Sequence, residues 1–487
     1  MRMKRFLIVA LALFLLGSLS YAEERNKEGV GLTIYSAPDQ GRSGGYAIVK
    51  EWRRLNLKKG RNRFKFQDVA KLIDATTVSF KSLTDPENTL VLEQNFEYDL
   101  VSTEKLLEKY IDKKIILEKE DDRGKVIGRK EATLLSAQGG NVVEMDGQIH
   151  LNPAGRIILP SLPEGLIARP TLVWLLEADK EGSHLAKVTY ETKGLGWHSD
   201  YIVIAKEGDR ALDLSGWVTI DNKSGATYKD AQLKLVAGDV HRAPEPDRVY
   251  ERRYKALAAV ESEGSGFAEK SFFEYHLYTL GRPSTLADNS IKQLELFRPV
   301  LDVPAKKIFL YYGNPGRYYF FSSPQTDRNL GTGSNKKVDI YLSFKNDESS
   351  GLAIPLPAGQ VRVYKEDPDD GSLEFIGEDT IDHTPKDEEV LLKLGSAFDI
   401  VGERKQTDFK VDNDRDWMEE SFEIALRNHK EEDVEVTVKE NLFRWTNWEI
   451  TENSHPYEKI DSRTIHFKVK VPKDEEVKIA YTVKYTW

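Results

Sequence analysis

The stretch GWHSDY, residues 196–201, places His198, Ser199 and Asp200 side by side, and these are the residue types of a Ser-His-Asp hydrolase. Such a triad requires the serine hydroxyl to hydrogen-bond the imidazole. Glycines around the stretch indicate a turn, and the apolar run YIVIA follows at once, so we predict that the stretch enters a β-strand. Successive side chains of a strand point to opposite faces, which places His198 and Asp200 on one face and Ser199 on the other. We therefore expect no triad here.

The other candidate metal and catalytic patterns are also incomplete. No two of the nine histidines lie at i, i+2 or i, i+4, and HExxH is absent. DPDDGSLEFIGE, residues 367–378, has carboxylates at the first, third and twelfth places of a calcium loop, but Gly371 and Ser372 occupy the fifth and sixth. We read it as a hairpin turn, and we predict no metal, no cofactor and no catalytic residue. An enzyme stays open as a hydrolase whose site is assembled from distant carboxylates and His198 or His276.

FRWTNWEIT brings Trp445 and Trp448 close together in a chain with 8 tryptophans. Exposed aromatic rings on a β-sandwich can stack on sugar rings through their faces. A spacing of three residues puts the two rings on opposite faces of a straight strand, which favours packing over a shared platform. Trp445 and Trp448 are nevertheless our candidate ligand-stacking residues.

The N-terminus is typical of a secretory signal peptide. Three basic residues precede an unbroken apolar run from Phe6 to Leu16, and the small-residue sequence SYA ends at Ala22. A transmembrane helix needs about 20 apolar residues, roughly twice the length of this run. We predict that residues 1–22 are cleaved after Ala22 and that the protein is exported to the periplasm or the extracellular space, with no stable membrane insertion afterwards.

Composition removes several classes of function. The chain of 487 residues has no cysteine, so disulfide scaffolds, thiol nucleophiles and cysteine-based metal sites are excluded. The formal net charge is -10, with acidic and basic residues interspersed. Binding to nucleic acid requires clustered Lys and Arg to displace counterions, so we expect no nucleic-acid partner.

Short alternating strands separated by Gly-rich and polar turns predict a mainly all-β, multi-domain protein of antiparallel β-sandwiches. One short helix is expected at 102–112, with Ser102 or Thr103 as N-cap and Glu104 in its first turn. The predicted domains are a small β unit at 23–101, the helix, a small SH3-like barrel at 113–164, a central sandwich at 165–400 with a mobile loop at 241–270, and an immunoglobulin-like sandwich at 401–487.

Several longer stretches resemble one family as a set. They are GLGWHSDYIVI, LSGWVTIDNKSGATYKDAQLKLVAGDV and YHLYTLGRPSTLADNSIKQLELF, followed by the region from VRVYKEDPDD to ERKQTDF and by FEIALRNHKEEDVEVTVKENL. Together they resemble the bacterial domain-of-unknown-function 4139 family, whose relatives are often labelled mucoidy inhibitor A-like. The resemblance covers roughly residues 165–487. It implies an exported, mainly β envelope protein and brings no reaction or catalytic residue with it.

These observations support three hypotheses. The first is a non-catalytic envelope protein that binds another protein or serves as a surface scaffold. The second is a polysaccharide-binding protein that uses exposed aromatics such as Trp445 and Trp448. The third is the hydrolase with a dispersed site. The oligomeric state is left open.

Overall fold

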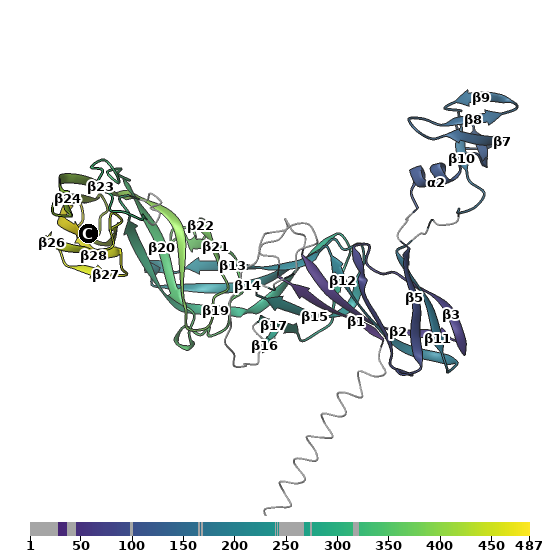
Figure 1. The fold of residues 1–487 in the computed structure, drawn as a ribbon, viewed down its shortest axis with the longest axis horizontal. Coiled ribbons are helices and arrows are strands. Elements are labelled where there is room, and N and C mark those ends of the chain that lie inside the picture. The colour runs from purple at the N-terminus through teal and green to yellow at the C-terminus, as the bar shows by residue number, and fades with distance from the viewer. Residues whose placement is uncertain are drawn as a thin grey trace, which may run out of the picture. The chain divides into compact units, whose positions relative to one another are not determined.

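The computed structural model of the chain describes residues 28–36, 45–97, 101–163, 166, 169–238, 240, 242, 267–272, 275–314 and 321–487. The protein is mostly β, which confirms the predicted fold class (Figure 1). It divides into two compact units. The first combines Met1–Trp197 with Ile220–Val236 and Thr279–Lys292, and the second combines His198–Thr219, Ala237–Tyr278 and Gln293–Trp487. The predicted signal peptide lies outside the described residues.

Most of the predicted loop at 241–270 also lies outside the described residues. Its last residues belong to a strand instead, β16 (Phe267–Phe272). Within the described ranges, no helix combines the length and apolar character needed to cross a bilayer.

The first unit contains most of a mixed sheet, packed against a smaller antiparallel one. The strand order of the mixed sheet is β16-β17-β15-β1-β2-β12-β4, with β18 paired to β15. Its further strands are β1 (Gly29–Tyr35), β2 (Tyr46–Leu57), β4 (Ile73–Ser82), β12 (Gly182–Lys193), β15 (Tyr228–Ala237), β17 (Tyr275–Leu280) and β18 (Ser284–Leu286). The smaller sheet consists of β3 (Gly60–Gln67), β11 (Thr171–Ala178) and β5 (Thr89–Glu97). The fully buried Trp174 joins the two sheets, with its ring centroid 5.1 Å from that of Phe66 and 5.2 Å from that of Phe80.

The predicted helix is confirmed as α2 (Thr103–Lys109), with Ser102 as its N-cap. The Ser102 hydroxyl accepts a hydrogen bond from the Lys105 amide at 3.3 Å, which satisfies one of the free N–H groups at the helix start. The helix is followed by Tyr110, which is buried against the sheet described next.

Residues 114–158 form the five strands that the sequence predicts, but the sheet stays open instead of closing into a barrel. Its order is β10-β6-β7-β8-β9, and among the described strands β10 pairs only with β6 and β9 only with β8. The strands are β6 (Lys114–Glu120), β7 (Val126–Ser136), β8 (Val142–Met145), β9 (Gln148–Leu151) and β10 (Arg156–Ile158). The last three strands are short, and Leu107 and Tyr110 cover the apolar face that closure would otherwise bury. The helix and Tyr110 thus cover the apolar face of the open sheet, which a closed barrel would have buried inside itself.

The second unit contains a long succession of paired strands with the order β22-β21-β13-β14-β19-β20-β23-β24-β29-β26. Its strands are β13 (Leu195–Ala205), β14 (Ala211–Asn222), β19 (Ser290–Tyr311), β20 (Lys337–Lys345), β21 (Gly359–Glu366), β22 (Leu373–Ile381), β23 (Glu389–Asp412), β24 (Trp417–Asn428), β26 (Trp448–Asn453) and β29 (Glu476–Thr486). Strand β25 (Val434–Asn441) pairs with β19 and with β28 (Thr464–Val471), which pairs with β27 (Tyr457–Lys459). Two short 3-10 turns are η1 (Glu207–Asp209) and η2 (Glu348–Ser350).

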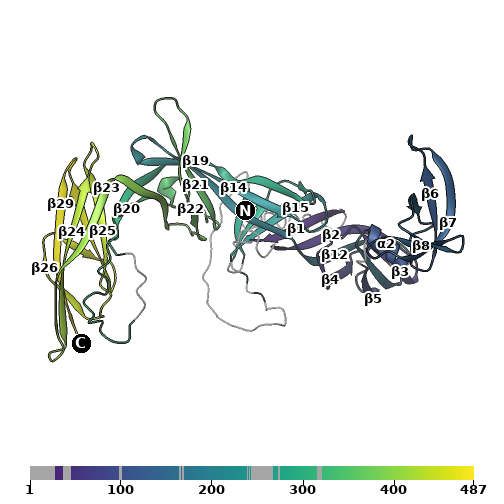
Figure 2. The same cartoon turned by 90° about the horizontal axis from the view of Figure 1, so that it is seen from above.

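The C-terminal part of this unit is a β-sandwich (Figure 2). Alternating apolar residues of β24, β25, β28 and β29 are buried in one core, as the period-2 pattern predicts. Phe309 and Tyr311 of β19 and Val338 of β20 belong to the same core. The sandwich therefore recruits strands that precede residue 401.

Three strands of the two units end at or just before a buried asparagine. In each case the side-chain amide of the asparagine donates to main-chain carbonyls. Asn222, at the end of β14, donates to Ala226 and Ala287 at 2.9 Å. Asn428, at the end of β24, donates to Glu432 at 2.8 Å and to Pro472 at 3.0 Å. Asn346, directly after β20, donates to Ile354 at 2.7 Å and to Pro385 at 2.9 Å. Each asparagine ties the turn after its strand to a segment far away in the sequence.

Candidate functional site

The side chains of GWHSDY alternate between the faces of β13 as expected. Ser199 is fully buried, whereas His198 and Asp200 lie on the other, partly exposed face. His198 Nε2 is 3.4 Å from Asp200 Oδ2, and Thr219 Oγ1 donates to the same oxygen at 2.5 Å. Because the serine is on the opposite face, the three residues do not form a nucleophilic triad.

Asp200 is the centre of a small ion-pair cluster. The hydrogen bond from His198 lowers the pKa of the Asp200 carboxyl below its ordinary value, with further contributions from Thr219 and from Arg362 at 3.6 Å. A carboxylate held in its charged form by three partners is a poor general base at neutral pH. His276 lies half-buried on β17. Among the described residues, no group of three or more His, Asp and Glu side chains is placed to hold a metal ion.

Trp445 and Trp448 are both half-buried and pack against the core of the C-terminal sandwich. The Trp448 indole N–H donates to the Ser462 carbonyl at 2.8 Å, and Lys459 Nζ lies 4.6 Å from the centroid of the Trp448 ring. One face of that ring is therefore covered by a cation of the same chain. Their role as stacking residues stays a prediction.

A different cluster, which the sequence did not single out, lies at the turn between β13 and β14. Gly208 and Asp209 in η1 have φ values of 75° and 56°. Asp is among the few residues other than glycine that adopt this left-handed conformation readily. The turn directs the Asp209 carboxylate toward Lys307 of β19 and Lys365 of β21, and both ammonium groups donate to it. We call these three residues the Asp209 cluster.

The electrostatics of the Asp209 cluster fix its charge state. Burial by itself raises the pKa of the Asp209 carboxyl, but the hydrogen bonds and charges of Lys307 and Lys365 outweigh burial and lower it below the ordinary value. The carboxylate is therefore ionised at neutral pH. With two ammonium groups around one carboxylate, the cluster carries one net positive charge.

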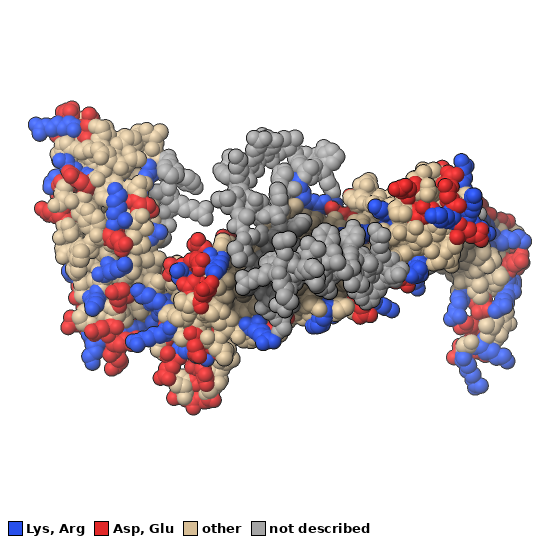
Figure 3. Space-filling model, turned by 90° about the horizontal axis from the view of Figure 1, so that it is seen from below, with Lys and Arg blue, Asp and Glu red and all other residues tan. Residues whose placement is uncertain are grey.

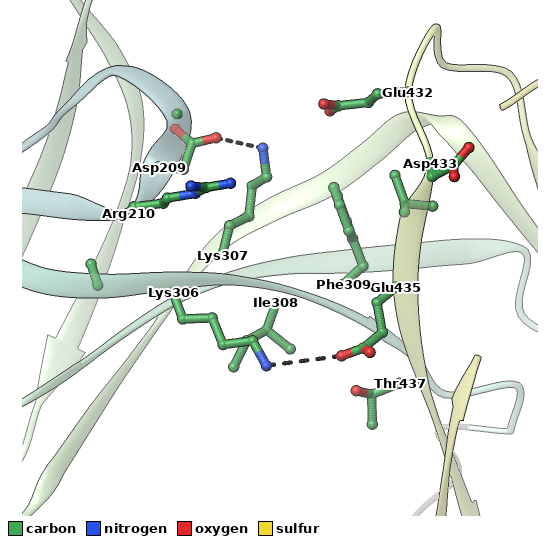
Figure 4. Close-up of a pocket in the computed structure, with 13 residues that line it drawn as sticks. Asp209, Arg210, Lys306, Lys307, Ile308, Phe309, Glu432, Asp433, Glu435 and Thr437 are labelled. Carbon is green, nitrogen blue, oxygen red and sulfur yellow. Dashed lines mark hydrogen bonds and ion pairs between the residues drawn. The ribbon is translucent and has the colours of Figure 1, made fainter. Parts of the chain in front are cut away.

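A hollow of about 290 Å³ opens beside the Asp209 cluster, and we call it the charged pocket (Figure 4). One wall consists of the η1 turn and β19, with Arg210, Lys306 and Lys307 as its cations. The other wall consists of β25 and the residues before it, with Glu432, Asp433 and Glu435 as its anions. Between the walls, Lys306 Nζ and Glu435 Oε1 are 3.9 Å apart.

The charged pocket offers binding groups and no evident reacting group. Arg210, Lys306, Glu432, Asp433 and Glu435 are all exposed, so their charges are available to a ligand. Phe309 supplies an apolar surface, and Lys307 Nζ lies 5.6 Å from its ring centroid. A pocket with walls of opposite sign suits a ligand that carries both signs of charge.

The fold and the site define an all-β protein of packed sheets with a binding pocket of mixed charge. The chain belongs to the family of the domain of unknown function DUF4139, whose model matches residues 186–487. The matched region contains every residue of the charged pocket and of the Asp209 cluster. No curated protein matches the chain.

Proposed function

We propose that the protein is exported and acts without catalysis, by binding another protein of the cell envelope through the charged pocket. The observation that carries the proposal is the pair of opposed walls, cationic on η1 and β19 and anionic on β25 and its preceding loop. A polypeptide segment with neighbouring acidic and basic side chains complements both walls at once.

Charge distribution favours a protein partner over a polyanion. On the face drawn in Figure 3, acidic and basic side chains are intermingled, without a broad patch of one sign. A nucleic acid or an acidic polysaccharide would meet the anionic wall of the pocket as well as the cationic one, and the net charge of -10 adds to the repulsion.

Export is part of the same proposal and rests on residues 1–22. Their basic start, apolar run and small residues before Glu23 support cleavage after Ala22. Cell fractionation, with N-terminal sequencing of the mature chain, tests this directly. A full-length cytoplasmic protein would contradict it.

The binding proposal is tested by reversing the cationic wall with Arg210→Glu and Lys306→Glu in one variant. The matched control is Lys468→Glu with Lys478→Glu, because these lysines are also exposed and, like Lys306, pair with carboxylates. The chains are used to capture interacting proteins from envelope extracts at low and at high salt. We expect a protein that binds the wild-type chain and the control, that is released by salt, and that is lost with the reversed wall.

Equal capture by the reversed-wall variant and the control would contradict the proposal. A partner that is retained at high salt would also count against it, because exposed charges are screened over about 8 Å at physiological ionic strength.

A further inference from the structure

A second hollow, of about 280 Å³, shares Asp209 and Lys307 with the charged pocket but is lined differently. We call it the apolar hollow. Its apolar lining comes from strands β13, β20, β22 and β23 and consists of Ala205, Ile340, Leu342, Ile376 and Leu394. Its polar groups gather at the Asp209 cluster, which contributes Lys307 and Lys365.

The strands around the apolar hollow belong to two groups that approach each other closely at its boundary. β22 is paired to β21, and β23 to β20. At Gly377 of β22, a Cβ atom would lie only 2.6 Å from the carbonyl oxygen of Leu394 on β23. Only glycine fits such an approach. The close approach of β22 to β23 beside the hollow thus depends on this glycine.

The Asp209 cluster gives the apolar hollow a cationic rim. Lys307 and Lys365 each keep about a third of the side chain exposed, at 32% and 36%, while Asp209 retains 13%. Both ammonium groups have donors to spare, since each carries three hydrogens and shares one carboxylate. An incoming anion can therefore join the lysines without removing Asp209.

We propose that the apolar hollow binds a small amphiphile, namely a hydrocarbon chain of medium length that ends in a carboxylate. Aliphatic side chains line the space for the hydrocarbon, and the two lysines receive the carboxylate. The volume lies near the lower end of small-molecule pockets, about 300 Å³, so a complete phospholipid is too large. This inference does not rest on the proposed protein partner, which is tested at Arg210 and Lys306, two residues that do not line the apolar hollow.

Calorimetric titration of the purified chain with octanoate, decanoate and decanol tests the ligand class. We expect decanoate to bind in a single site. Each methylene removed weakens binding about fourfold, from the transfer free energy of a buried methylene. Decanol, which lacks the anion, binds about two- to fivefold more weakly than decanoate.

Two variants of the Asp209 cluster should shift carboxylate binding in opposite directions. Lys307→Gln combined with Lys365→Gln abolishes the preference for decanoate over decanol. Asp209→Asn keeps the left-handed turn, because Asn also tolerates positive φ, and it removes the competing negative charge. Decanoate affinity should rise about two- to fivefold, while decanol affinity stays unchanged.

A filling variant locates the binding site. Leu394→Trp should block both decanoate and decanol. Leu391→Trp is the matched control on the same strand, because Leu391 is 49% exposed and does not line the hollow.

Photoreactive decanoate on the wild-type chain gives a second localisation that needs no variant, and it should label the segment around Ile340, Ile376 or Leu394. Absence of decanoate binding at millimolar concentration, labelling elsewhere, or full binding by a folded Leu394→Trp chain would overturn the inference. None of these results affects the capture experiment at Arg210 and Lys306.

Discussion

The turn at Asn222, which lies in the first unit, and the turn at Asn428, which lies in the second, are built alike, but the cores of the two units hold different polar groups. At both turns a buried asparagine, Asn222 or Asn428, donates to the carbonyl four residues on and to carbonyls of a distant segment. The strands that lead into the turns even share nearly the same burial pattern. The same local chemistry thus turns the chain in both units.

The core of the second unit contains two buried Arg-Glu-Tyr groups. Arg404 binds Glu440, whose carboxylate also accepts from Tyr481, and Arg444 binds Glu420 at 2.8 Å. Arg444 is fully buried and donates to the carbonyls of Gln325, Asp327 and Leu330. Burial raises the pKa of the Glu420 carboxyl in spite of the arginines.

The first unit has a simpler arrangement. Glu51 is 2% exposed, accepts from the Tyr190 hydroxyl at 2.7 Å and pairs with Arg53. The Arg53 side chain is 34% exposed, so its charge remains hydrated. The buried arginines of the second unit therefore have a role beyond the asparagine turns, which form in the described part of the first unit without a fully buried arginine beside them. They hold the segment 325–331, which forms no strand, to the end of the sandwich.

The largest expected effect follows from removing a buried arginine. Arg444→Met leaves the buried Glu420 without its arginine partner and removes a donor from three main-chain carbonyls, and we expect a loss of about 3–5 kcal/mol in the free energy of unfolding. Arg53→Met in the first unit should cost less, about 1.5–3 kcal/mol, because Arg53 itself is partly exposed but Glu51 stays buried with Tyr190 as its remaining partner. Urea unfolding followed by tryptophan fluorescence measures both. Equal losses in the free energy of unfolding would show that the two cores do not differ in this respect.

The asparagine turns should respond alike. Asn222→Ala and Asn428→Ala each remove several hydrogen bonds from a buried amide to main-chain carbonyls, and each should cost about 1–3 kcal/mol. Asn447→Ala serves as the control, since the side chain of this exposed asparagine donates to Thr486 alone among the described residues, and the change in stability should be less than about 0.5 kcal/mol. A large effect at one turn and none at the other would show that the resemblance between them is only geometric.

Removing one tyrosine hydroxyl from each core shows how strongly each buried glutamate depends on its tyrosine. Tyr190→Phe removes one of the two partners of Glu51, and we expect a loss of about 1.5–3 kcal/mol because the acceptor is a buried carboxylate. Tyr485→Phe should cost about 1 kcal/mol, because Arg444 and Gln406 still bind Glu420. Thermal unfolding of the two variants beside the wild-type chain measures the difference. A reversed order would mean that the arginines contribute less than their burial indicates.

The smallest expected effect is a pH dependence at the Asp209 cluster. The folded-state pKa of Asp209 is lowered, so its stabilising contribution is present above the unfolded value of about 3.8 and is lost as pH falls through the folded value. Wild type should exceed Asp209→Asn in stability by up to about 1 kcal/mol at pH 7. The difference should shrink as pH falls below about 3.8, as measured by urea unfolding at several pH values. A difference that grows on acidification would contradict the assignment.

The elements set by neighbouring residues were predictable from the sequence. Ser102, the acidic first turn and the apolar face are local, and α2 forms where they predict it. The alternation in GWHSDY likewise separates Ser199 from His198, as the pleat requires. Barrel closure at 114–158 was not predictable, because it depends on whether β9 and β10 are long enough to meet.

The Asp209 cluster could not be predicted from the residues next to Asp209. Lys307 and Lys365 are 98 and 156 residues away from Asp209 in the sequence, and only the pairing of β13 with β21 and the course of β19 bring them together. The glycine before Asp209 was the one local signal, since it marks a tight turn. The partners of Arg444 in the segment 325–330 are separated from it by more than a hundred residues in the same way.

Site-specific photo-crosslinking in living cells tests whether the charged pocket binds another protein. A photoreactive amino acid at position 210 reports on the pocket, and one at position 468 reports on an exposed site of the C-terminal sandwich. We predict one discrete protein adduct from position 210 and none of that mass from position 468. An unmodified chain at position 210, or the same adducts from both positions, would contradict the claim.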